Sequence, residues 1–338
     1  MKGVVITKPG VAVLRDIKKP KPKDDEVLIR VKSAGLCGSD MHIFQGRHLF
    51  RIPPVMPGHE LAGEIAAAGK EVGRFREGDR VTVLPSINCG ICPACVSGNT
   101  NLCGSAAVPG TNDWSGAFVQ YITAPERIVY AIKPKTPYEN AVLAEPLAVA
   151  VHIVRRLNKG KRMIILGCGT IGLLVLKVAL HNGFEEVYCT DICDFNLKTA
   201  IKMGAAAAWN AEIEDVAANT DRVTGSSGMD SVIITASAEL LNMGLTLAAD
   251  RGDVVMVAMT TKPVPIDLSL PYRKELRFTG TKIYTAEDFT EALGYIEGGV
   301  DFSPVVTHLL PMSEAQRAFD ISLNKTEDVI KILLDPEK

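Results

Sequence analysis

Four side chains of zinc-binding types lie at well-separated positions in the first half of the chain. Cys37 comes first, His59 and Glu60 follow a proline-rich turn, and Glu145 lies far downstream. A thiolate, an imidazole and carboxylates form a ligand set that binds zinc and leaves a coordination position open for a substrate. These residues therefore predict a catalytic metal ion.

Two residues close to Cys37 are candidates for moving a proton. Ser39 lies two residues after Cys37, and His42 lies five residues after it. Zinc lowers the pKa of bound water to ~7, so a bound alcohol would also release a proton, which must reach solvent. Ser39 and His42 could form a hydroxyl-to-imidazole relay, and Glu60 is a third catalytic candidate. The alternatives are a turn hydroxyl for Ser39 and a solvated loop histidine for His42.

A second group of metal-binding residues is contained in one short segment. Four thiolates at its spacing can surround a tetrahedral ion, for which zinc is the usual choice. All four positions would be filled by protein, so this ion would be structural. The alternatives are four reduced thiols packed as small apolar side chains, or a zinc ribbon that binds nucleic acid. The residues are Cys89, Cys92, Cys95 and Cys103.

A glycine-rich turn predicts a dinucleotide site. The segment has the spacing Gly-x-Gly-x-x-Gly, follows an apolar run and opens a helical pattern, as such a site requires. The first glycine permits the turn, the second lets backbone approach a pyrophosphate, and the third lets helix and strand pack closely. The helix N-terminus offers N–H groups to phosphate. The candidate residues are Gly167, Gly169, Thr170, Ile171 and Gly172.

Asp191 ends the next predicted strand, where an acid that binds the adenosine ribose belongs. Its carboxylate can accept hydrogen bonds from both ribose hydroxyls and would repel a 2′-phosphate. The next residues, Ile192, Cys193 and Asp194, include no arginine to bind that phosphate. We therefore expect NAD rather than NADP. The alternative is a domain that keeps the glycine turn but has lost its cofactor.

Two patterns of secondary structure divide the chain into the parts that must position these residues. Residues 1–150 contain many short β-type runs separated by turns, which predicts a β-barrel-like domain with the zinc lobe at 85–105. From 151 to 284, strands alternate with helix-length segments, which predicts a doubly wound parallel sheet. Residues 285–338 are expected to pack back onto the first domain. The predicted fold class is α/β.

Composition narrows the function classes. The chain has 338 residues, 47% of them apolar, and a formal net charge of −2. This charge argues against nucleic acid or an anionic membrane as the main partner. The most apolar run, 163–180, contains three glycines and a lysine, so it does not predict a membrane span. The N-terminal residues predict a strand rather than a signal peptide, and clustered cysteines favour metal binding in a reducing, cytoplasmic compartment.

Taken together, these motifs resemble the zinc-dependent medium-chain alcohol dehydrogenases over essentially the whole chain. The resemblance is carried by the segments 35–42, 58–60 and 78–81, the four cysteines, Glu145-Pro146, and the glycine turn with Asp191. It implies a GroES-like barrel domain plus a Rossmann domain, with the active site in the cleft between them. It also implies a homodimer or a homotetramer.

The resemblance assigns roles to several residues. It implies that Cys37 and His59 bind the catalytic zinc, that Glu60, Glu145 or water completes the ligand set, and that Asp40 orients His59. Ethanol-oxidising members usually supply a second cysteine where this chain has Glu145. That departure is similar to sorbitol, threonine and related polyol or sugar dehydrogenases. Candidate substrate-lining residues are Arg47, His48, Phe50 and Trp114, whereas His152 and His308 are expected to be packing or surface histidines.

We therefore expect an NAD-dependent and zinc-dependent oxidoreductase with two zinc ions per chain. Its expected reaction converts a secondary alcohol of a polyol, sugar derivative or cyclitol to a ketone. The second hypothesis is an enzyme similar to L-threonine 3-dehydrogenase that acts on a small hydroxy acid. A third, from another class, is a non-catalytic protein that senses dinucleotides.

Overall fold

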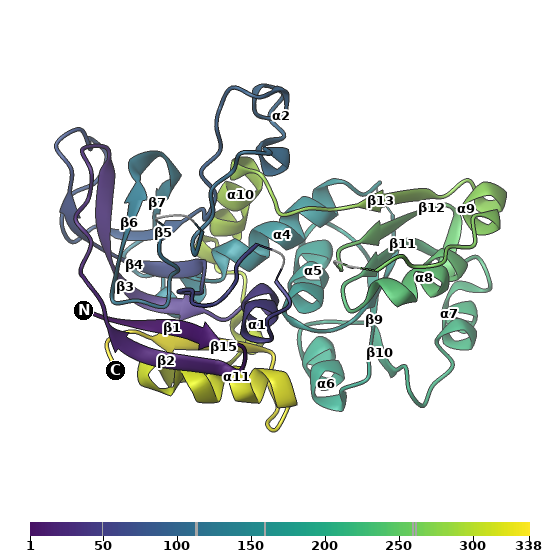
Figure 1. The fold of residues 1–338 in the computed structure, drawn as a ribbon. Helices are drawn as coiled ribbons and strands as arrows, with labels where there is room; N and C mark the ends of the chain where they lie inside the picture. The colour runs from purple at the N-terminus through teal and green to yellow at the C-terminus, as the bar shows by residue number, and fades with distance from the viewer. Residues whose placement is uncertain (49, 112–113, 159, 259, 261) are drawn as a thin grey trace. The chain divides into compact units, whose positions relative to one another are not determined.

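The computed structural model describes residues 1–338 except 49, 112–113, 159, 259 and 261 (Figure 1). The chain forms two compact units. The first comprises Met1–Glu145 together with Thr285–Lys338, and the second comprises Pro146–Tyr284. The C-terminal segment thus belongs to the same unit as the N-terminal one.

The first unit contains a seven-stranded sheet in the order β14-β15-β3-β4-β5-β7, with β6 paired to β3. Its central strands are β3 (Glu26–Gly35) and β4 (Glu60–Ala68), which are antiparallel, and β15 (Lys331–Asp335) runs antiparallel to β3 on the other side. The register pairs Gly35 with both Glu60 and Leu333. The C-terminal end of β3 therefore lies beside the N-terminal end of β4 on one side and beside β15 on the other.

The remaining elements of this unit are the other strands of this sheet, a separate two-stranded sheet of β1 and β2, and the helices. The strands are β5 (Arg80–Val83), β6 (Tyr121–Pro125), β7 (Val129–Ala131), β14 (Val306–Pro311), and the hairpin β1 (Lys2–Lys8) and β2 (Val11–Asp16). The helices are α1 (Gly38–Phe44), α2 (Pro93–Val96), α3 (Tyr138–Ala141), α10 (Ala286–Glu297) and α11 (Ala315–Asn324), and α4 (Ala144–Arg155) begins at the end of the unit.

An aromatic cluster in the first unit fixes α1 against the C-terminal segment. Phe44 of α1 stacks on Phe319 of α11 with ring centroids 4.6 Å apart, and Phe118 meets Phe319 edge-on at 6.4 Å. All three side chains are almost fully buried. Such pairs contribute about 0.5–1.5 kcal/mol beyond the burial of their area. The helix that follows Cys37 is therefore held by Phe319, which lies 275 positions after Phe44 in the chain.

The second unit contains the doubly wound sheet that the sequence predicts. Six parallel strands lie in the order β10-β9-β8-β11-β12-β13, and the order reverses at β8. The strands are β8 (Arg162–Leu166), β9 (Glu186–Asp191), β10 (Ala207–Asn210), β11 (Met229–Ile234), β12 (Ala248–Met256) and β13 (Arg277–Gly280). The helices are α5 (Thr170–His181), α6 (Asp194–Lys202), α7 (Val216–Thr224), α8 (Leu241–Leu247) and α9 (Ser269–Lys274).

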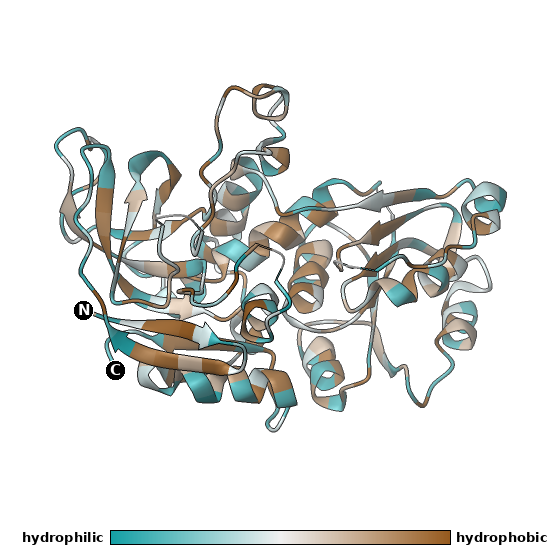
Figure 2. Ribbon diagram, in the orientation of Figure 1, coloured by the Kyte–Doolittle hydropathy of each residue, from teal (hydrophilic) through white to brown (hydrophobic). Residues whose placement is uncertain are grey.

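Apolar strand residues form the core of the second unit. Ile164, Leu166, Val232, Ile234 and Val254 are fully buried. Figure 2 shows the hydrophobic colouring of β11 and β12, as expected for strands covered on both faces. Within the described part of the chain, no helix is both long and apolar enough to cross a membrane.

Candidate metal centres and dinucleotide site

The first predicted metal ligands come together where β3 ends and β4 begins. Cys37 follows β3 by two residues, and His59 immediately precedes β4, so the antiparallel pairing of these strands places both residues at the same end of the strand pair. One ligand atom each from Cys37, His59 and Glu60 lies within 4.8 Å of the other two. The three residues are thus close enough to hold one ion.

Backbone details fix the geometry of this cluster. Asp40 is fully buried, and its two carboxylate oxygens accept hydrogen bonds from the N–H of Cys37 at 3.1 Å and of Gly58 at 3.0 Å. Gly58 has φ +94°, and a side chain there would overlap the Phe118 ring. Asp40 therefore joins the segment that carries Cys37 to the segment that carries His59. It lies 4.0 Å from Nδ1 of His59, too far for a hydrogen bond.

Glu145 also lies at the cluster. Its Oε1 is 4.0 Å from Nε2 of His59, and the residue is buried in the first turn of α4. Burial opposes a charged imidazole, but the negative charges of Cys37, Glu145 and Asp40 outweigh it and raise the pKa of His59 to about 10. The same negative field would attract a metal cation.

The donor set fits a zinc ion. Among the described residues, the buried His59 Nδ1 has no hydrogen-bond partner, which is rare for a buried polar atom in proteins. A thiolate, an imidazole and a carboxylate are donors that zinc accepts, and Glu145 is a fourth candidate nearby. Cys37, His59, Glu60 and Glu145 are therefore the residues that would hold it.

Lys331 is a further residue at this centre, and the sequence motifs do not predict it. Its Nζ lies 2.5 Å from Glu60 and donates to the Leu36 carbonyl at 2.9 Å. Burial alone would lower the pKa of Lys331, but the charges of Glu60 and Cys37 raise it. Glu60 is thus placed between an ammonium group and the metal ligands. The available signal was a lysine that opens an apolar strand run, since a buried lysine requires an acidic partner.

The predicted proton relay lies on α1. Ser39 is half-buried and His42 is exposed in the last turn. Residues three apart are neighbours on a helix surface, so the two side chains share one face. No hydrogen bond joins them within the described residues, and their role as a relay stays a prediction.

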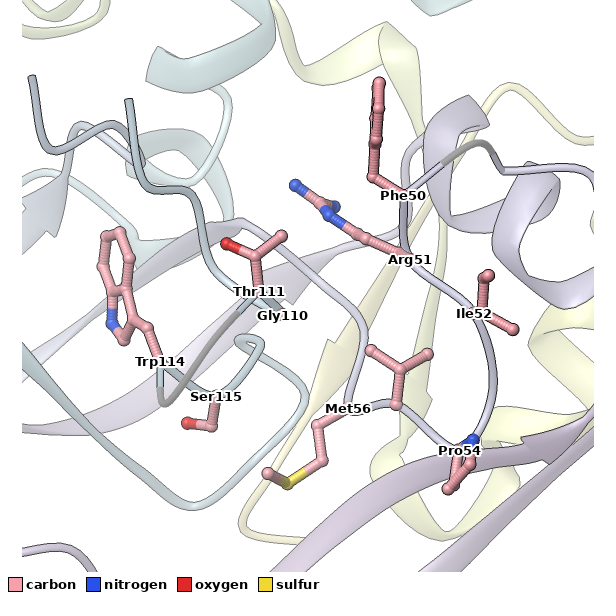
Figure 3. A pocket seen from close by; sticks show the side chains of 10 residues that line it. Phe50, Arg51, Ile52, Pro54, Met56, Gly110, Thr111, Trp114 and Ser115 are labelled. Carbon is pink, nitrogen blue, oxygen red and sulfur yellow. The ribbon is translucent and has the colours of Figure 1, made fainter. Parts of the chain in front are cut away.

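The predicted substrate-lining residues differ in their positions. Phe50 and Trp114 line a cavity of about 510 Å³ in the first unit (Figure 3). His48 instead accepts hydrogen bonds at Nδ1 from the backbone N–H groups of Phe50 and Arg51, and Arg47 is exposed. Arg51, which the sequence motifs do not single out, lines the cavity.

The two histidines expected to be structural have ordinary surroundings. His152 is buried in α4, and His308 contacts Glu327 at 3.1 Å and Thr307 at 3.0 Å.

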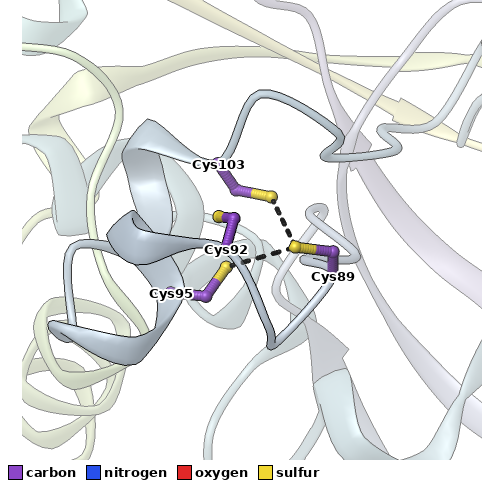
Figure 4. Close-up of side chains that lie close together, drawn as sticks. All are labelled: Cys89, Cys92, Cys95 and Cys103. Carbon is purple, nitrogen blue, oxygen red and sulfur yellow. Dashed lines mark hydrogen bonds between the residues drawn. The ribbon is translucent and has the colours of Figure 1, made fainter.

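The four-cysteine lobe forms a second cluster (Figure 4). One sulfur atom from each of the four residues lies within 4.8 Å of the others, and none is in a disulfide. Cys89 lies 3.8 Å from Cys95 and 3.6 Å from Cys103. Backbone N–H groups of Ile91 and Cys92 lower the pKa of Cys89 to about 6, which favours the thiolate that zinc binds. Gly90 and Gly98 have positive φ, so the chain can wrap around the site.

Replacing Cys103 by serine is expected to release the zinc of this lobe. Removing one of four ligands should weaken zinc binding by at least about 100-fold and leave the segment without a core. Metal analysis should show one zinc ion fewer per chain, and limited proteolysis should cut between residues 89 and 103. The exposed Cys193, in the second unit, supplies the control variant Cys193→Ser. Unchanged metal content in Cys103→Ser would show that the lobe holds no ion.

The glycine turn has the backbone geometry that a dinucleotide site requires. Gly167 follows β8 with φ +113°, and a Cβ there would meet Ala236 at 2.7 Å. A Cβ on Gly172 would overlap the Gly167 carbonyl, whereas a Cβ on Gly169 would meet open space. Because α5 begins at Thr170, the N-terminus of this helix lies directly after the glycine turn, where backbone N–H groups can bind a phosphate.

Asp191 ends β9 beside this turn. Its Oδ2 accepts a hydrogen bond from the Cys168 N–H at 2.7 Å, and its Oδ1 accepts those of Ile192 and Cys193. The Asn196 side-chain amide also donates to Oδ2 at 3.3 Å, so each oxygen of this half-exposed carboxylate accepts two hydrogen bonds, and ribose hydroxyls would have to displace or share them. Its position fits a ribose acceptor. Cys168 is buried, and its hydrogen bond with the Cys189 thiol together with burial raises the pKa of its own thiol, which disfavours the reactive thiolate.

Comparison with known families agrees with both parts of the fold. Residues 23–134 match the alcohol dehydrogenase GroES-like domain, and residues 170–298 match the zinc-binding dehydrogenase family. The predicted combination of a GroES-like domain with a Rossmann-like parallel sheet is thereby confirmed.

Individual proteins match along nearly the whole chain. A sorbitol dehydrogenase of Bacillus subtilis is 31% identical, covering 100% of this chain and 98% of the relative. An L-threonine 3-dehydrogenase of Bacillus velezensis is 32% identical, covering 92% of each. A crystal structure of an alcohol dehydrogenase from E. coli CFT073 in complex with NADH superimposes with a TM-score of 0.91 at 27% identity, covering 99% of both chains.

Proposed function

This chain belongs to the zinc-dependent medium-chain alcohol dehydrogenase family, and we propose that it oxidises a secondary alcohol of a polyol, sugar derivative or cyclitol to a ketone, with NAD as the hydride acceptor. The observation that carries the proposal is the cluster of Cys37, His59 and Glu60, with Glu145 beside His59. A carboxylate in place of a second cysteine supports a polyol rather than an ethanol-like substrate.

We assign one zinc ion to this cluster and one to the four-cysteine lobe. When bound at the first site, zinc supplies Lewis acidity toward the substrate oxygen. Cys37, His59 and a carboxylate of Glu60 or Glu145 would hold it. Asp40 accepts hydrogen bonds from the backbone N–H groups of Cys37 and Gly58, which holds the two segments together and positions the side chains of Cys37 and His59. Ser39 accepts the hydroxyl proton, and the exposed His42 passes it to solvent.

The likeness to a threonine dehydrogenase supports a second candidate, a small hydroxy acid as substrate. NADH absorbance would be followed with sorbitol, xylitol, myo-inositol and L-threonine. Turnover of polyols above L-threonine supports the first proposal, and the reverse order supports the second. Failure of every alcohol with a protein that carries two zinc ions and binds NAD would favour the dinucleotide-sensing hypothesis.

Replacing Asp191 by alanine is expected to weaken the preference for NAD. The carboxylate that binds the ribose hydroxyls and repels a 2′-phosphate would be lost, so the ratio of kcat/KM for NAD to that for NADP should fall about 10- to 100-fold. Steady-state kinetics with both cofactors measures this ratio. The control is Glu212→Ala, which removes an exposed acid of the same unit. An unchanged ratio would contradict the assignment of Asp191.

We further propose a cytoplasmic homodimer or homotetramer. Free thiols at both metal clusters support a reducing compartment. Light scattering of the purified protein distinguishes the two oligomers.

A further inference from the structure

Among its described lining residues, the cavity of about 510 Å³ in the first unit has one cationic side chain, Arg51. Its described lining residues come from two segments of the chain, and they are Phe50, Arg51, Ile52, Pro54, Val55, Met56, Gly110, Thr111, Trp114 and Ser115. Arg51 comes from the first segment, and Thr111, Trp114 and Ser115 come from the second. In Figure 3 the guanidinium end of Arg51 extends toward the side of the cavity that carries Thr111 and Trp114.

The Arg51 backbone is fixed by a hydrogen bond, and its side chain passes close to Gly110. Its N–H donates to Nδ1 of His48 at 3.0 Å, and a Cβ built on Gly110 would be 3.8 Å from its Cδ. The side chain is partly buried, and burial lowers the pKa of its guanidinium, which nevertheless stays charged at neutral pH. Within the described residues, no acid forms an ion pair with it, and none of the described lining residues carries a carboxylate.

Most of the other polar side chains of the cavity already donate hydrogen bonds within the protein. The Trp114 indole N–H donates to the Thr123 carbonyl at 2.9 Å, and the Thr111 hydroxyl donates to the Val108 carbonyl at 2.5 Å. His48 is no second cation, because burial and the charge of Arg51 lower its pKa. Arg51 and the Ser115 hydroxyl are therefore the donors available to a bound molecule among the described lining residues.

Two observations relate the cavity to the metal cluster, one from the sequence and one from electrostatics. Met56, which lines it, precedes the ligand His59 by three residues. The negative charges of Cys37 and Asp40 act on the Arg51 guanidinium. These two observations support the idea that one substrate molecule reaches both the cluster and Arg51.

We propose that Arg51 binds an anionic group of the substrate, so that the preferred substrate is a polyol derivative bearing a carboxylate or a phosphate rather than a neutral polyol. The inference rests on the proposed dehydrogenase function and specifies its substrate class. A guanidinium forms paired, charge-assisted hydrogen bonds with either anion. A neutral polyol would leave this partly desolvated cation without a counter-ion.

The test compares three matched substrates, namely sorbitol, D-gluconate and sorbitol 6-phosphate, with the zinc-loaded enzyme and NAD. At least one anionic substrate should have a kcat/KM about 10-fold or more above that of sorbitol. Arg51→Gln should lower kcat/KM for that substrate about 10- to 100-fold, mainly through KM, and should change the value for sorbitol less than about 3-fold. Arg51→Lys should recover part of the loss.

Two further measurements separate binding from turnover. Calorimetric titration of D-gluconate and of sorbitol 6-phosphate into the enzyme without NAD should show binding that Arg51→Gln weakens. Arg76→Gln, which removes an exposed arginine of the same unit, should match the parent protein. Preference for the carboxylate or for the phosphate identifies the anion, and either result supports the inference.

Equal kcat/KM values for all three substrates, unaffected by Arg51→Gln, would overturn the anion site while leaving the dehydrogenase proposal intact. Turnover of none of these substrates, nor of the neutral polyols and L-threonine above, would instead overturn the proposed function. Gluconate binding would then still be measurable by calorimetry, and its independence of Arg51 would overturn the inference as well.

Discussion

Replacing Cys37 by serine is expected to lower turnover by at least about 1000-fold, because the first metal cluster loses its thiolate and with it the Lewis acid, which is worth several kcal/mol of barrier. Metal analysis should show about one zinc ion per chain instead of two. NAD affinity should change less than about 3-fold, since the glycine turn and Asp191 belong to the other unit. Steady-state rates, zinc content and NAD titration measure the three effects.

Cys37→Ala serves as a second variant, because a serine oxygen can remain a weak ligand. Cys193→Ser is the matched control, since it removes an exposed thiol that belongs to neither metal cluster. Full activity of both Cys37 variants would contradict the assignment of a catalytic ion to Cys37 and His59. Loss of NAD binding together with turnover would point to misfolding instead.

Replacing Lys331 by methionine is expected to destabilise the folded protein by about 3–5 kcal/mol, because Glu60 would keep a buried charge without its partner. Lys331 and Glu60 are both almost fully buried and lie 2.5 Å apart. Urea unfolding followed by circular dichroism should give a clearly lower midpoint. The first unit is the one affected, so the fall in the urea midpoint followed by fluorescence should be larger in a Trp209→Phe background, which keeps Trp114, than in a Trp114→Phe background, which keeps Trp209.

A matched control is Lys32→Met on β3. Lys32 pairs with Glu64 and Glu337 in a more exposed setting, where such pairs are worth about 0–1 kcal/mol. The double variant Lys331→Met/Glu60→Gln should recover part of the stability, because it removes the unpaired charge. A Lys331→Met variant as stable as Lys32→Met would contradict this prediction and show that another positive charge, such as the metal ion, balances the charge of the Glu60 carboxylate.

Local sequence patterns predicted the parts of the protein whose geometry is set within a short segment. The four cysteines of the lobe lie within fifteen consecutive positions, 89–103, and their spacing alone allows them to surround an ion. The glycine turn is likewise local, because the conformations of Gly167 and Gly172 follow from the strand-to-helix connection. The alternating strands and helices of the second unit follow from hydrophobic periodicity.

Residue types also predicted candidate ligands that lie far apart in the chain, but not their distances. Resemblance to a family assigned Glu60 and Glu145 to one metal site and left open which of them binds. The structure places Glu145 4.0 Å from His59 and places Glu60 against Lys331. Neither contact has a signature in the spacing of the residues.

The order of strands decided the rest. Lys331 and Glu60 are 271 positions apart and meet because β15 and β4 flank β3 in one sheet. Hydrophobic periodicity tells which residues are buried but not which strand is the neighbour, so a buried lysine and its acid could not be paired in advance. In the same way, the local sequence does not reveal that Arg51 shares a cavity with Thr111 and Trp114. Sequence thus determined the ligand chemistry of this protein, and tertiary packing determined which charges surround it.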